Sequence, residues 1–162
     1  MLVEPIHHSD RSHLLAVAID TGLFAANEAE LLLGEIIDSL ASGTLPEGHE
    51  AVCCRFERGL PAVGWSYFAP DQHAENVWNI WWIGVDPGNL GTGAGQHLLR
   101  HVEGKIASSG GRLVVIETSA ADSLARARRF YQAQGYTECG RVPDFYAIGE
   151  SKVIFARHPR AA

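Results

Sequence analysis

One glycine-rich segment constrains the fold of this chain more than any other feature. Residues 85–95 read Val-Asp-Pro-Gly-Asn-Leu-Gly-Thr-Gly-Ala-Gly, between a β-prone run and an amphipathic helical pattern. Glycines at alternate positions let consecutive backbone N–H groups point into one concavity, because no Cβ stands in the way. The helix that follows adds its partly positive N-terminus. The segment predicts a phosphate-binding loop; a tight glycine turn into a helix is the structural alternative.

Two common phosphate-binding motifs do not match this segment. A P-loop needs Gly-Lys-Ser/Thr after four spacers, but Gly104-Lys105 is followed by Ile106 inside the helical pattern. A dinucleotide fingerprint needs a third glycine where this chain has Gln96 or Leu98. The spacing therefore excludes both motifs.

Hydrophobic periodicity sets the order of the remaining elements. We expect helices at about 10–22, 27–42, 96–110 and 122–135, and strands at 51–56, 62–68, 76–85, 113–116, 136–142 and 152–156. Asn27 with Glu30 resembles a capping box at the start of the second helix. This order predicts an α+β fold, with a mixed sheet and helices on both faces. No linker or repeat divides the chain, so residues 1–162 are expected to form a single domain.

Composition narrows the classes of partner and location. Thirteen Lys and Arg against nineteen Asp and Glu give a net charge of −6, which disfavours nucleic acid. No apolar run reaches the ~18 residues that a membrane span needs. The first residues lack a basic and an apolar region, so no secretory signal is expected. The adjacent Cys53 and Cys54 indicate buried thiols in a reducing compartment, and we expect a cytoplasmic protein.

The glycine segment resembles the acetyl-CoA loop of the GNAT N-acyltransferase superfamily. That family's pattern, V-x-P-x-x-[QR]-[GA]-x-G-x-[GA], is matched at Val85, Pro87, Gly91, Gly93 and Gly95. A second signature, F-Y-x-x-x-G-[FY], is similar to residues 130–136. Residues 142–155 look like the closing hairpin of many members, and the N-terminal helix pair looks like their substrate-side lid. Together the resemblances cover nearly the whole chain.

The resemblance implies a mostly antiparallel sheet whose fourth and fifth strands splay apart around the pantetheine arm of acetyl-CoA. It also implies three groups of site residues. The diphosphate would be held by the backbone of Leu90, Gly91, Thr92, Gly93, Ala94, Gly95 and Gln96. Pantetheine and the thioester would be contacted by the backbone of Ile83, Gly84 and Val85, with Tyr131 beside the sulfur. The acceptor side would include Phe24, Trp81 and Ser119.

Aminolysis of a thioester suits these residues. An alkyl ammonium has a pKa of about 10.4 and must lose a proton before it attacks. A backbone N–H near Val85 could stabilise the oxyanion. The phenol of Tyr131 could donate to the departing thiolate, although an aromatic side chain that only packs a helix on the sheet is the alternative.

The general base departs from the family pattern. Members often have Glu or Asp six residues before the motif valine, where this chain has Asn79. We expect Glu117, through water, to collect the amine proton while Asn79 orients that water. A structural glutamate paired with an arginine is the alternative. Leu90 and Leu124 replace polar residues that contact the cofactor in many members.

The sequence thus predicts an acetyl-CoA-dependent N-acetyltransferase acting on a primary amine of a small molecule or peptide, through a ternary complex. The alternatives are a weakly catalytic acyl-CoA-binding regulatory protein and a nucleotide-dependent oxidoreductase. His97 and His101 lack a third ligand, so no metal is expected. Arg126, Arg128 and Arg129 could meet the ribose phosphate of coenzyme A or form a solvated helix face. The chain could also form a homodimer, and the acceptor cannot be identified from the sequence.

Overall fold

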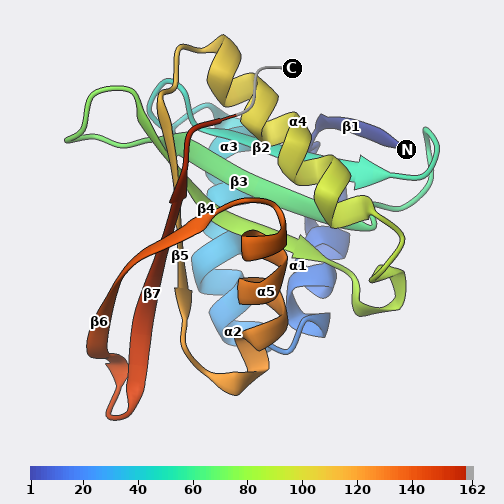
Figure 1. The fold of residues 1–162 in the computed structure, drawn as a ribbon. Helices are drawn as coiled ribbons and strands as arrows, with labels where there is room; N and C mark the ends of the chain where they lie inside the picture. The colour runs from blue at the N-terminus through green and yellow to red at the C-terminus, as the bar shows by residue number, and fades with distance from the viewer. Residues whose placement is uncertain (160–162) are drawn as a thin grey trace. The chain divides into compact units, whose positions relative to one another are not determined.

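The computed structural model describes residues 1–159, and within them seven strands form one mixed sheet in the order β1-β2-β3-β4-β5-β7-β6 (Figure 1). The elements run β1 (Leu2–Pro5), α1 (Arg11–Asp20), α2 (Ala26–Ala29), α3 (Glu35–Ser42), β2 (Glu50–Arg55), β3 (Gly64–Pro70), β4 (Val77–Val85), α4 (Ala94–Ser108), β5 (Leu113–Ser119), α5 (Ala125–Ala133), β6 (Thr137–Ala147) and β7 (Glu150–Arg157). None of the helices described is both long and apolar enough to cross a membrane.

Strand pairing confirms the expected fold class. The pairs β1–β2, β2–β3, β5–β7 and β6–β7 are antiparallel, whereas β4 and β5 run parallel. The parallel ladder joins only Val77–Asn79 to Leu113–Val115, although β4 continues to Val85 and β5 to Ser119. A mixed sheet with helices on both sides and a short ladder between β4 and β5 is the α+β arrangement expected from the sequence.

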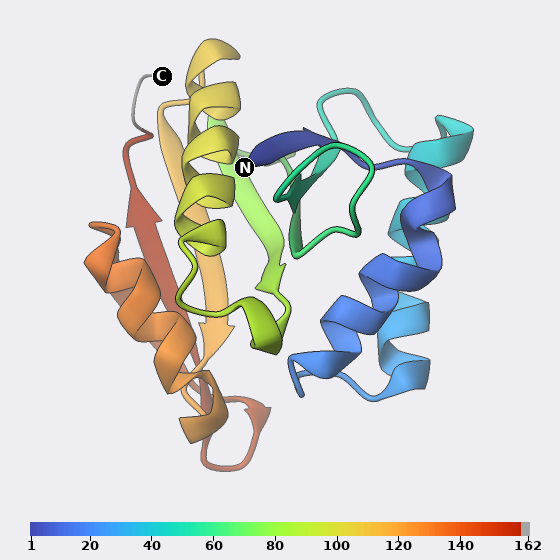
Figure 2. The ribbon, with the colours of Figure 1, turned by 90° about the vertical axis from the view of Figure 1, so that its right-hand side faces the viewer.

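The chain divides into two compact units, and the first comprises Met1–Ala69 with Trp82–Val102. In this unit α1 and the segment from α2 to α3 lie side by side (Figure 2). Their buried aliphatic side chains, among them Leu14 and Ile37, pack in one core with Trp65 and Trp82 of the strands. Burial of this apolar surface is the main force that holds the helix pair on the strands.

The second unit comprises Pro70–Trp81 and the chain from Glu103 onward. Here α5 packs against the sheet through Tyr131, whose ring centroid lies 5.8 Å from that of Phe155 on β7. Figure 2 shows this helix alongside the strand. The long hairpin of β6 and β7 has a register irregularity between Val142 and Ala147. Four large apolar side chains of this hairpin are exposed, namely those of Val142, Phe145, Tyr146 and Ile148.

The N-terminal strand β1 was not expected from the sequence. It contains Pro5 and only four residues, so its pattern is too short and too broken to indicate a strand. A proline is tolerated there because β1 is an edge strand. The side chain of Arg55 secures it from β2, with Nε 2.8 Å from the carboxylate of Glu4. This additional strand makes the parallel pair the fourth and fifth of the sheet.

The second helix differs from the sequence prediction in its start and in its geometry. The predicted cap residue Asn27 lies inside α2; the N-cap is Ala25, whose backbone N–H donates to the Glu28 carboxylate at 2.8 Å. Residues 30–34 then form a turn of π-helix before α3. Arg11 of α1 packs against that turn and donates to Asp38 at 2.7 Å. Periodicity predicted one continuous helix because a π-turn leaves no clear signal in a single sequence.

Candidate active site

The glycine segment forms an exposed loop that leads into α4. Gly91 and Gly93 have φ of +84° and +88°, and a Cβ at either would meet no atom within 4 Å. Two side chains of the segment stabilise its conformation. Asp86 accepts a hydrogen bond from the Gly88 N–H at 2.9 Å, and the Thr92 hydroxyl donates to Asn89 O at 2.7 Å. The loop is therefore a defined turn that needs glycine for its backbone conformation rather than for packing space.

The backbone donors of this loop are available. The N–H groups of residues 91–95 donate no hydrogen bond within the described part of the chain. The first intrahelical bond nearby is that from the His97 N–H to Gly93 O, at 2.9 Å. The first N–H groups of any helix lack intrahelical partners and carry partial positive charge. A 15-residue helix with such a start suits an anionic ligand.

Leu90 precedes these donors and is 41 % exposed. It carries no group that could bind a phosphate, so any contact at this position comes from the backbone, as its departure from the family pattern predicted. Ala94, in contrast, is buried and anchors the first turn of α4. Gly95 and Gln96 complete that turn, and both are partly exposed. The predicted diphosphate-binding residues thus form one continuous segment.

The C-terminal end of β4 lies just before this loop. Ile83, Gly84 and Val85 are half-buried. Gly64 of β3 lies directly against them, since a Cβ there would come within 2.7 Å of Gly84 O. The Asp86 N–H closes the segment by donating to Val63 O at 2.9 Å. The backbone predicted to pair with pantetheine is therefore held rigidly from the β3 side.

Tyr131 lies in the second unit, in a cluster of aromatic rings. Its side chain is 7 % exposed, and its ring contacts those of Phe130, Tyr136 and Phe155 at centroid distances of 5.7, 6.3 and 5.8 Å. Burial raises the pKa of the Tyr131 phenol to about 12. The hydroxyl therefore stays protonated at physiological pH and can donate a hydrogen bond.

Glu117 of β5 already has a partner. Its carboxylate oxygen Oε2 lies 2.5 Å from Nζ of Lys152 on β7. The register partner of Glu117 on β7 is Ile154, two residues after Lys152. Lys152 in turn lies over the ring of Phe145, with Nζ 3.6 Å from the centroid. The ion pair resembles the structural alternative considered above, with a lysine in place of an arginine.

Asn79 is held by an aspartate that the sequence analysis did not consider. Its side chain is 8 % exposed, and its Nδ2 donates to the carboxylate of Asp71 at 2.9 Å. Asp71 also accepts from the His73 N–H at 2.9 Å. The hydrogen bonds from His73 and Asn79 lower the pKa of Asp71. Its position at a turn, beside a polar residue of the next strand, is the only signal that could have indicated this carboxylate.

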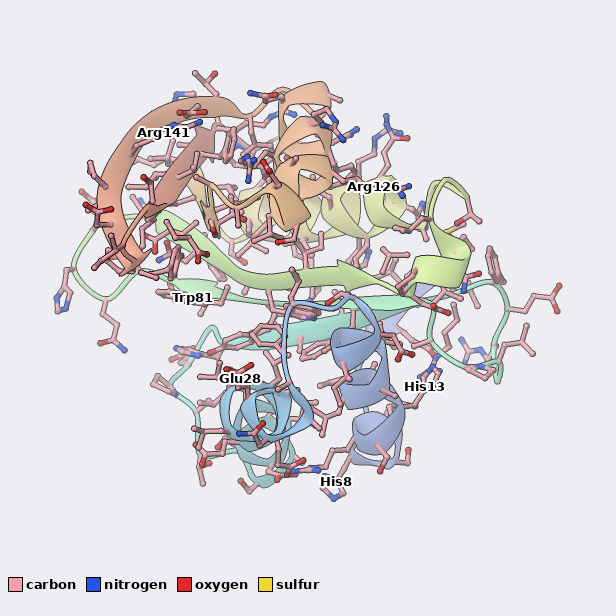
Figure 3. All side chains as sticks on the ribbon, turned by 90° about the horizontal axis from the view of Figure 1, so that it is seen from below. His8, His13, Glu28, Trp81, Arg126 and Arg141 are labelled. Carbon is pink, nitrogen blue, oxygen red and sulfur yellow. The ribbon has the colours of Figure 1, made fainter. Side chains whose placement is uncertain are left out.

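The three residues predicted on the acceptor side have different environments. Phe24, in the connection between α1 and α2, packs on Trp82 with ring centroids 5.4 Å apart. Trp81 is 59 % exposed on β4 (Figure 3). Ser119 is buried at the end of β5, where its hydroxyl donates to Glu150 at 2.6 Å and accepts from the Ala121 N–H at 2.9 Å. Ser119 thus supports the turn that follows β5.

Two of the arginines considered above, Arg126 and Arg128, have different surroundings. Arg128 donates to the carbonyls of Ser119 and Ala121 at 2.6 and 2.8 Å, so it stabilises the turn into α5. Arg126 projects from α5 into solvent (Figure 3). Within residues 1–159, no group of three or more His, Cys, Asp or Glu side chains could hold a metal ion.

Three buried polar atoms are enclosed with no hydrogen-bond partner in the described structure: the indole Nε1 of Trp82, Oε1 of Glu103 and the hydroxyl of Tyr136. The sequence analysis gave neither Trp82 nor Glu103 a role in the site. Glu103 is 1 % exposed, and its nearest cation is Arg157, at 3.8 Å. Both residues occupy positions that helical or strand periodicity predicts to be inside, which is why the sequence did not single them out.

Comparison with known proteins identifies the family. The family model described as "Acetyltransferase (GNAT) family" matches residues 32–136, more than half of the 162 residues. A search of curated proteins found no match. Among solved structures, a GNAT-family protein from Desulfovibrio desulfuricans has a TM-score of 0.88 at 26 % identity, covering 98 % of this chain and 99 % of that chain.

Two enzymes with named substrates share the fold at lower identity. The ribosomal-protein-S18-alanine N-acetyltransferase of Escherichia coli has a TM-score of 0.70 at 17 % identity, covering 99 % of this chain and 95 % of that chain. An aminoglycoside 6'-N-acetyltransferase complexed with coenzyme A has a TM-score of 0.72 at 14 % identity, covering 100 % and 99 %. The family match, together with the glycine loop between β4 and α4, shows that this chain belongs to the GNAT family of acetyltransferases.

Proposed function

We propose that residues 1–162 act as one N-acetyltransferase domain, which transfers the acetyl group of acetyl-CoA to a primary amine of a small molecule or peptide. The single observation that carries this proposal is the loop that leads into α4, in which the backbone N–H groups of residues 91–95 lack acceptors among the described residues. The solved relatives support acetyl-CoA as the donor, since one of them is a complex with coenzyme A. The named substrates of the two enzymes above do not transfer to this chain at 14–17 % identity.

In this proposal the backbone does the binding. The N–H groups of residues 90–96 hold the diphosphate, and the backbone of residues 83–85 pairs with the pantetheine arm. An N–H at Gly84 or Val85 donates to the thioester oxygen and stabilises the oxyanion as it forms. Because these donors are fixed by the loop and by the contact of Gly64 with β4, little reorganisation is needed when charge develops.

Tyr131 serves the leaving group. The amine nitrogen forms a bond to the carbonyl carbon, the carbon–sulfur bond breaks, and the sulfur leaves as a thiolate that must be stabilised or protonated. A phenol with a pKa of about 12 is a weaker acid than a thiol, whose pKa is about 8.5. Tyr131 therefore acts as a hydrogen-bond donor to the developing thiolate and keeps its own proton.

The attacking amine must lose a proton, and we propose Glu117 as its acceptor, through water oriented by Asn79. The contact between Asn79 and Asp71 supports a fixed orientation of the Asn79 amide. The ion pair with Lys152 occupies one oxygen of the Glu117 carboxylate, Oε2. The second oxygen, Oε1, accepts the proton in this proposal.

Following free thiol while the pure protein is incubated with acetyl-CoA and a panel of amines tests the proposal. Release of coenzyme A that depends on one of the amines, with one acetyl group gained by that amine, is the expected result. The second candidate is an acyl-CoA-binding regulatory protein, which is favoured by Asn79 in place of a carboxylate. Thermal stabilisation by acetyl-CoA with no thiol release from any amine would support that candidate instead.

The location and assembly of the protein are part of the same proposal. Cys53 and Cys54 are free and buried in the core, which supports folding in a reducing compartment such as the cytoplasm. We propose no nucleic-acid partner, because the net charge is −6. A homodimer stays an expectation that size-exclusion chromatography with light scattering would test.

A further inference from the structure

Lys152 of β7 carries a primary amine that is in contact with the proposed base. Its Nζ lies 2.5 Å from Oε2 of Glu117 and 3.6 Å from the centroid of the Phe145 ring. A carboxylate and an aromatic face are both groups that bind an ammonium in proteins. The fold therefore holds one of its own amines against the carboxylate that we propose to collect the proton of an acceptor amine.

Strand register places this amine on the same face of the sheet as the polar residues predicted for the site. Asn79 pairs with Val115, and Glu117 has its side chain on the same face because it lies two residues further along β5. Ser119 lies two residues beyond Glu117, and its direct register partner is Lys152. All of these residues belong to the second unit. Lys152 therefore shares one face with the asparagine, glutamate and serine of the predicted site.

The ladder between β4 and β5 ends just before Glu117. The pair of Asn79 and Val115 is the last one, although β5 continues to Ser119. In the proposed function the pantetheine arm lies beside the part of β5 that does not pair with β4, and Glu117 belongs to that part. The amine that Glu117 holds is thus on the strand segment that the acetyl donor is proposed to follow.

A lysine at this position is better suited to react than to form a structural ion pair. All but two of the thirteen Lys and Arg residues of the chain are arginine, and the exceptions are Lys105 and Lys152. An arginine at position 152 would pair with the carboxylate through two hydrogen bonds, but it stays protonated and cannot attack a thioester. Lysine makes the weaker ion pair and supplies the nucleophile.

We propose that Lys152 is itself an acceptor, so that the enzyme transfers the acetyl group of its bound acetyl-CoA to Nζ of its own Lys152. This inference rests on the proposed function. Oε2 of Glu117 takes a proton from the ammonium, the freed lone pair of Nζ forms a bond to the carbonyl carbon, and the carbon–sulfur bond breaks. Of the two protons that leave the nitrogen, one neutralises the thiolate of coenzyme A and the other reaches solvent. The amide that forms carries no charge, so acetylation ends the ion pair with Glu117.

Peptide mapping by mass spectrometry tests the proposal on the native protein, incubated with acetyl-CoA and no added amine. Lys105 on α4 is the internal reference, because its acetylation measures direct chemical reaction with acetyl-CoA. We expect Lys152 to gain one acetyl group about 10²-fold or more faster than Lys105. The rate per molecule should not change with protein concentration, because donor and acceptor belong to the same molecule. A rate that rises in proportion to protein concentration would overturn transfer within one chain.

Two glutamate variants test the part of the carboxylate. Glu117→Gln keeps the shape of the side chain and removes the proton acceptor, so it should slow acetylation of Lys152 about tenfold or more. Glu138→Gln is the matched control, because Glu138 is likewise ion-paired, with Arg141 at 2.5 Å, and should leave the rate unchanged. Thermal unfolding checks that both variants fold. Equal rates in the two variants would overturn the role of Glu117 in this step.

The two proposals fail in different ways. Thiol release with an added amine while Lys152 stays unmodified, or is modified no faster than Lys105, overturns self-acetylation and leaves the proposed function standing. Acetylated Lys152 without thiol release from any added amine supports self-acetylation and contradicts transfer to a small molecule or peptide. The absence of both reactions would overturn both proposals.

Discussion

The glycine loop of the first unit and the polar side chains of the second unit illustrate two ways of building a site. The loop is exposed, and the N–H groups of residues 91–95 have no acceptor in the part of the chain that the structure describes. In the second unit Tyr131 is enclosed among aromatic rings, Glu117 is paired with Lys152, and Asn79 is bonded to Asp71. In the proposed function, binding by the loop depends on backbone conformation alone, whereas the chemistry of the side chains depends on their neighbours.

The largest effect is expected from Tyr131→Phe. Loss of the hydroxyl donor should lower kcat by about 10²-fold or more and leave the KM for acetyl-CoA nearly unchanged. Steady-state kinetics check this, with Tyr136→Phe as the matched control because Tyr136 lies in the same ring cluster. Since burial raises the pKa of Tyr131 to about 12, its donor should not be lost as the pH rises from 7 to 10. Equal turnover in the two variants would remove Tyr131 from the reaction.

Gly93→Val should act on binding rather than on turnover. A β-branched residue at φ +88° is strained by about 1–3 kcal/mol, and the free loop can relieve this strain by changing its conformation. Binding of coenzyme A must then restore the strained conformation, so its dissociation constant should rise roughly 5- to 150-fold. Calorimetric titration measures this constant. Gly59→Val is the matched control, because Gly59 has φ +85° and similarly open surroundings in the β2–β3 hairpin. Similar coenzyme A affinities for the two variants would separate the loop from the cofactor.

The conformation of the glycine loop could be predicted from the sequence, whereas the partners of the polar side chains could not. Alternating glycines before a helix specify a turn locally, and Gly91 and Gly93 do have positive φ. Their part in holding a diphosphate stays a prediction. The partners of Asn79 and Glu117 lie eight and 35 residues away in the chain. Contacts of this kind depend on strand register and turns, which a single sequence does not specify.

The elements of the fold show the same limit. Long, periodic segments such as α4 and β4 were predicted closely, whereas the edge strand β1 and the π-turn before α3 were not. Both exceptions are stabilised by distant ion pairs, those of Arg55 with Glu4 and of Arg11 with Glu30. Tertiary contacts of this kind override weak local preferences.

A smaller effect is expected from Glu117→Gln, and Lys152→Gln tells a base from a structural ion pair. If Glu117 collects the amine proton, Glu117→Gln should lower kcat about tenfold. Lys152→Gln breaks the same ion pair but keeps the carboxylate, so it should retain most of the turnover. Equal losses of kcat in the two variants would show that Glu117 serves only the ion pair.

The smallest effect is expected from Asn79→Ala. The hydrogen bonds that Asp71 accepts from His73 and Asn79 lower the pKa of its carboxyl below the usual value of 3.8. They therefore stabilise the fold fully at a pH above 3.8, and this stabilisation is lost as the pH falls through the lowered pKa. Thermal unfolding should show a loss of about 2 °C at pH 7 that shrinks as the pH falls below 3.8. A difference in melting temperature that is independent of pH would rule out the carboxylate as the source.

The most direct test of the account is a comparison of coenzyme A with pantetheine, which lacks the diphosphate. With glycine labelled by nitrogen-15, coenzyme A should shift the amide resonances of Gly91, Gly93 and Gly95 strongly, and pantetheine should not. The resonance of Gly59 serves as an internal reference in both titrations. Resonances of the three loop glycines that stay in place while coenzyme A binds would contradict the account, because the loop would then not be the diphosphate site.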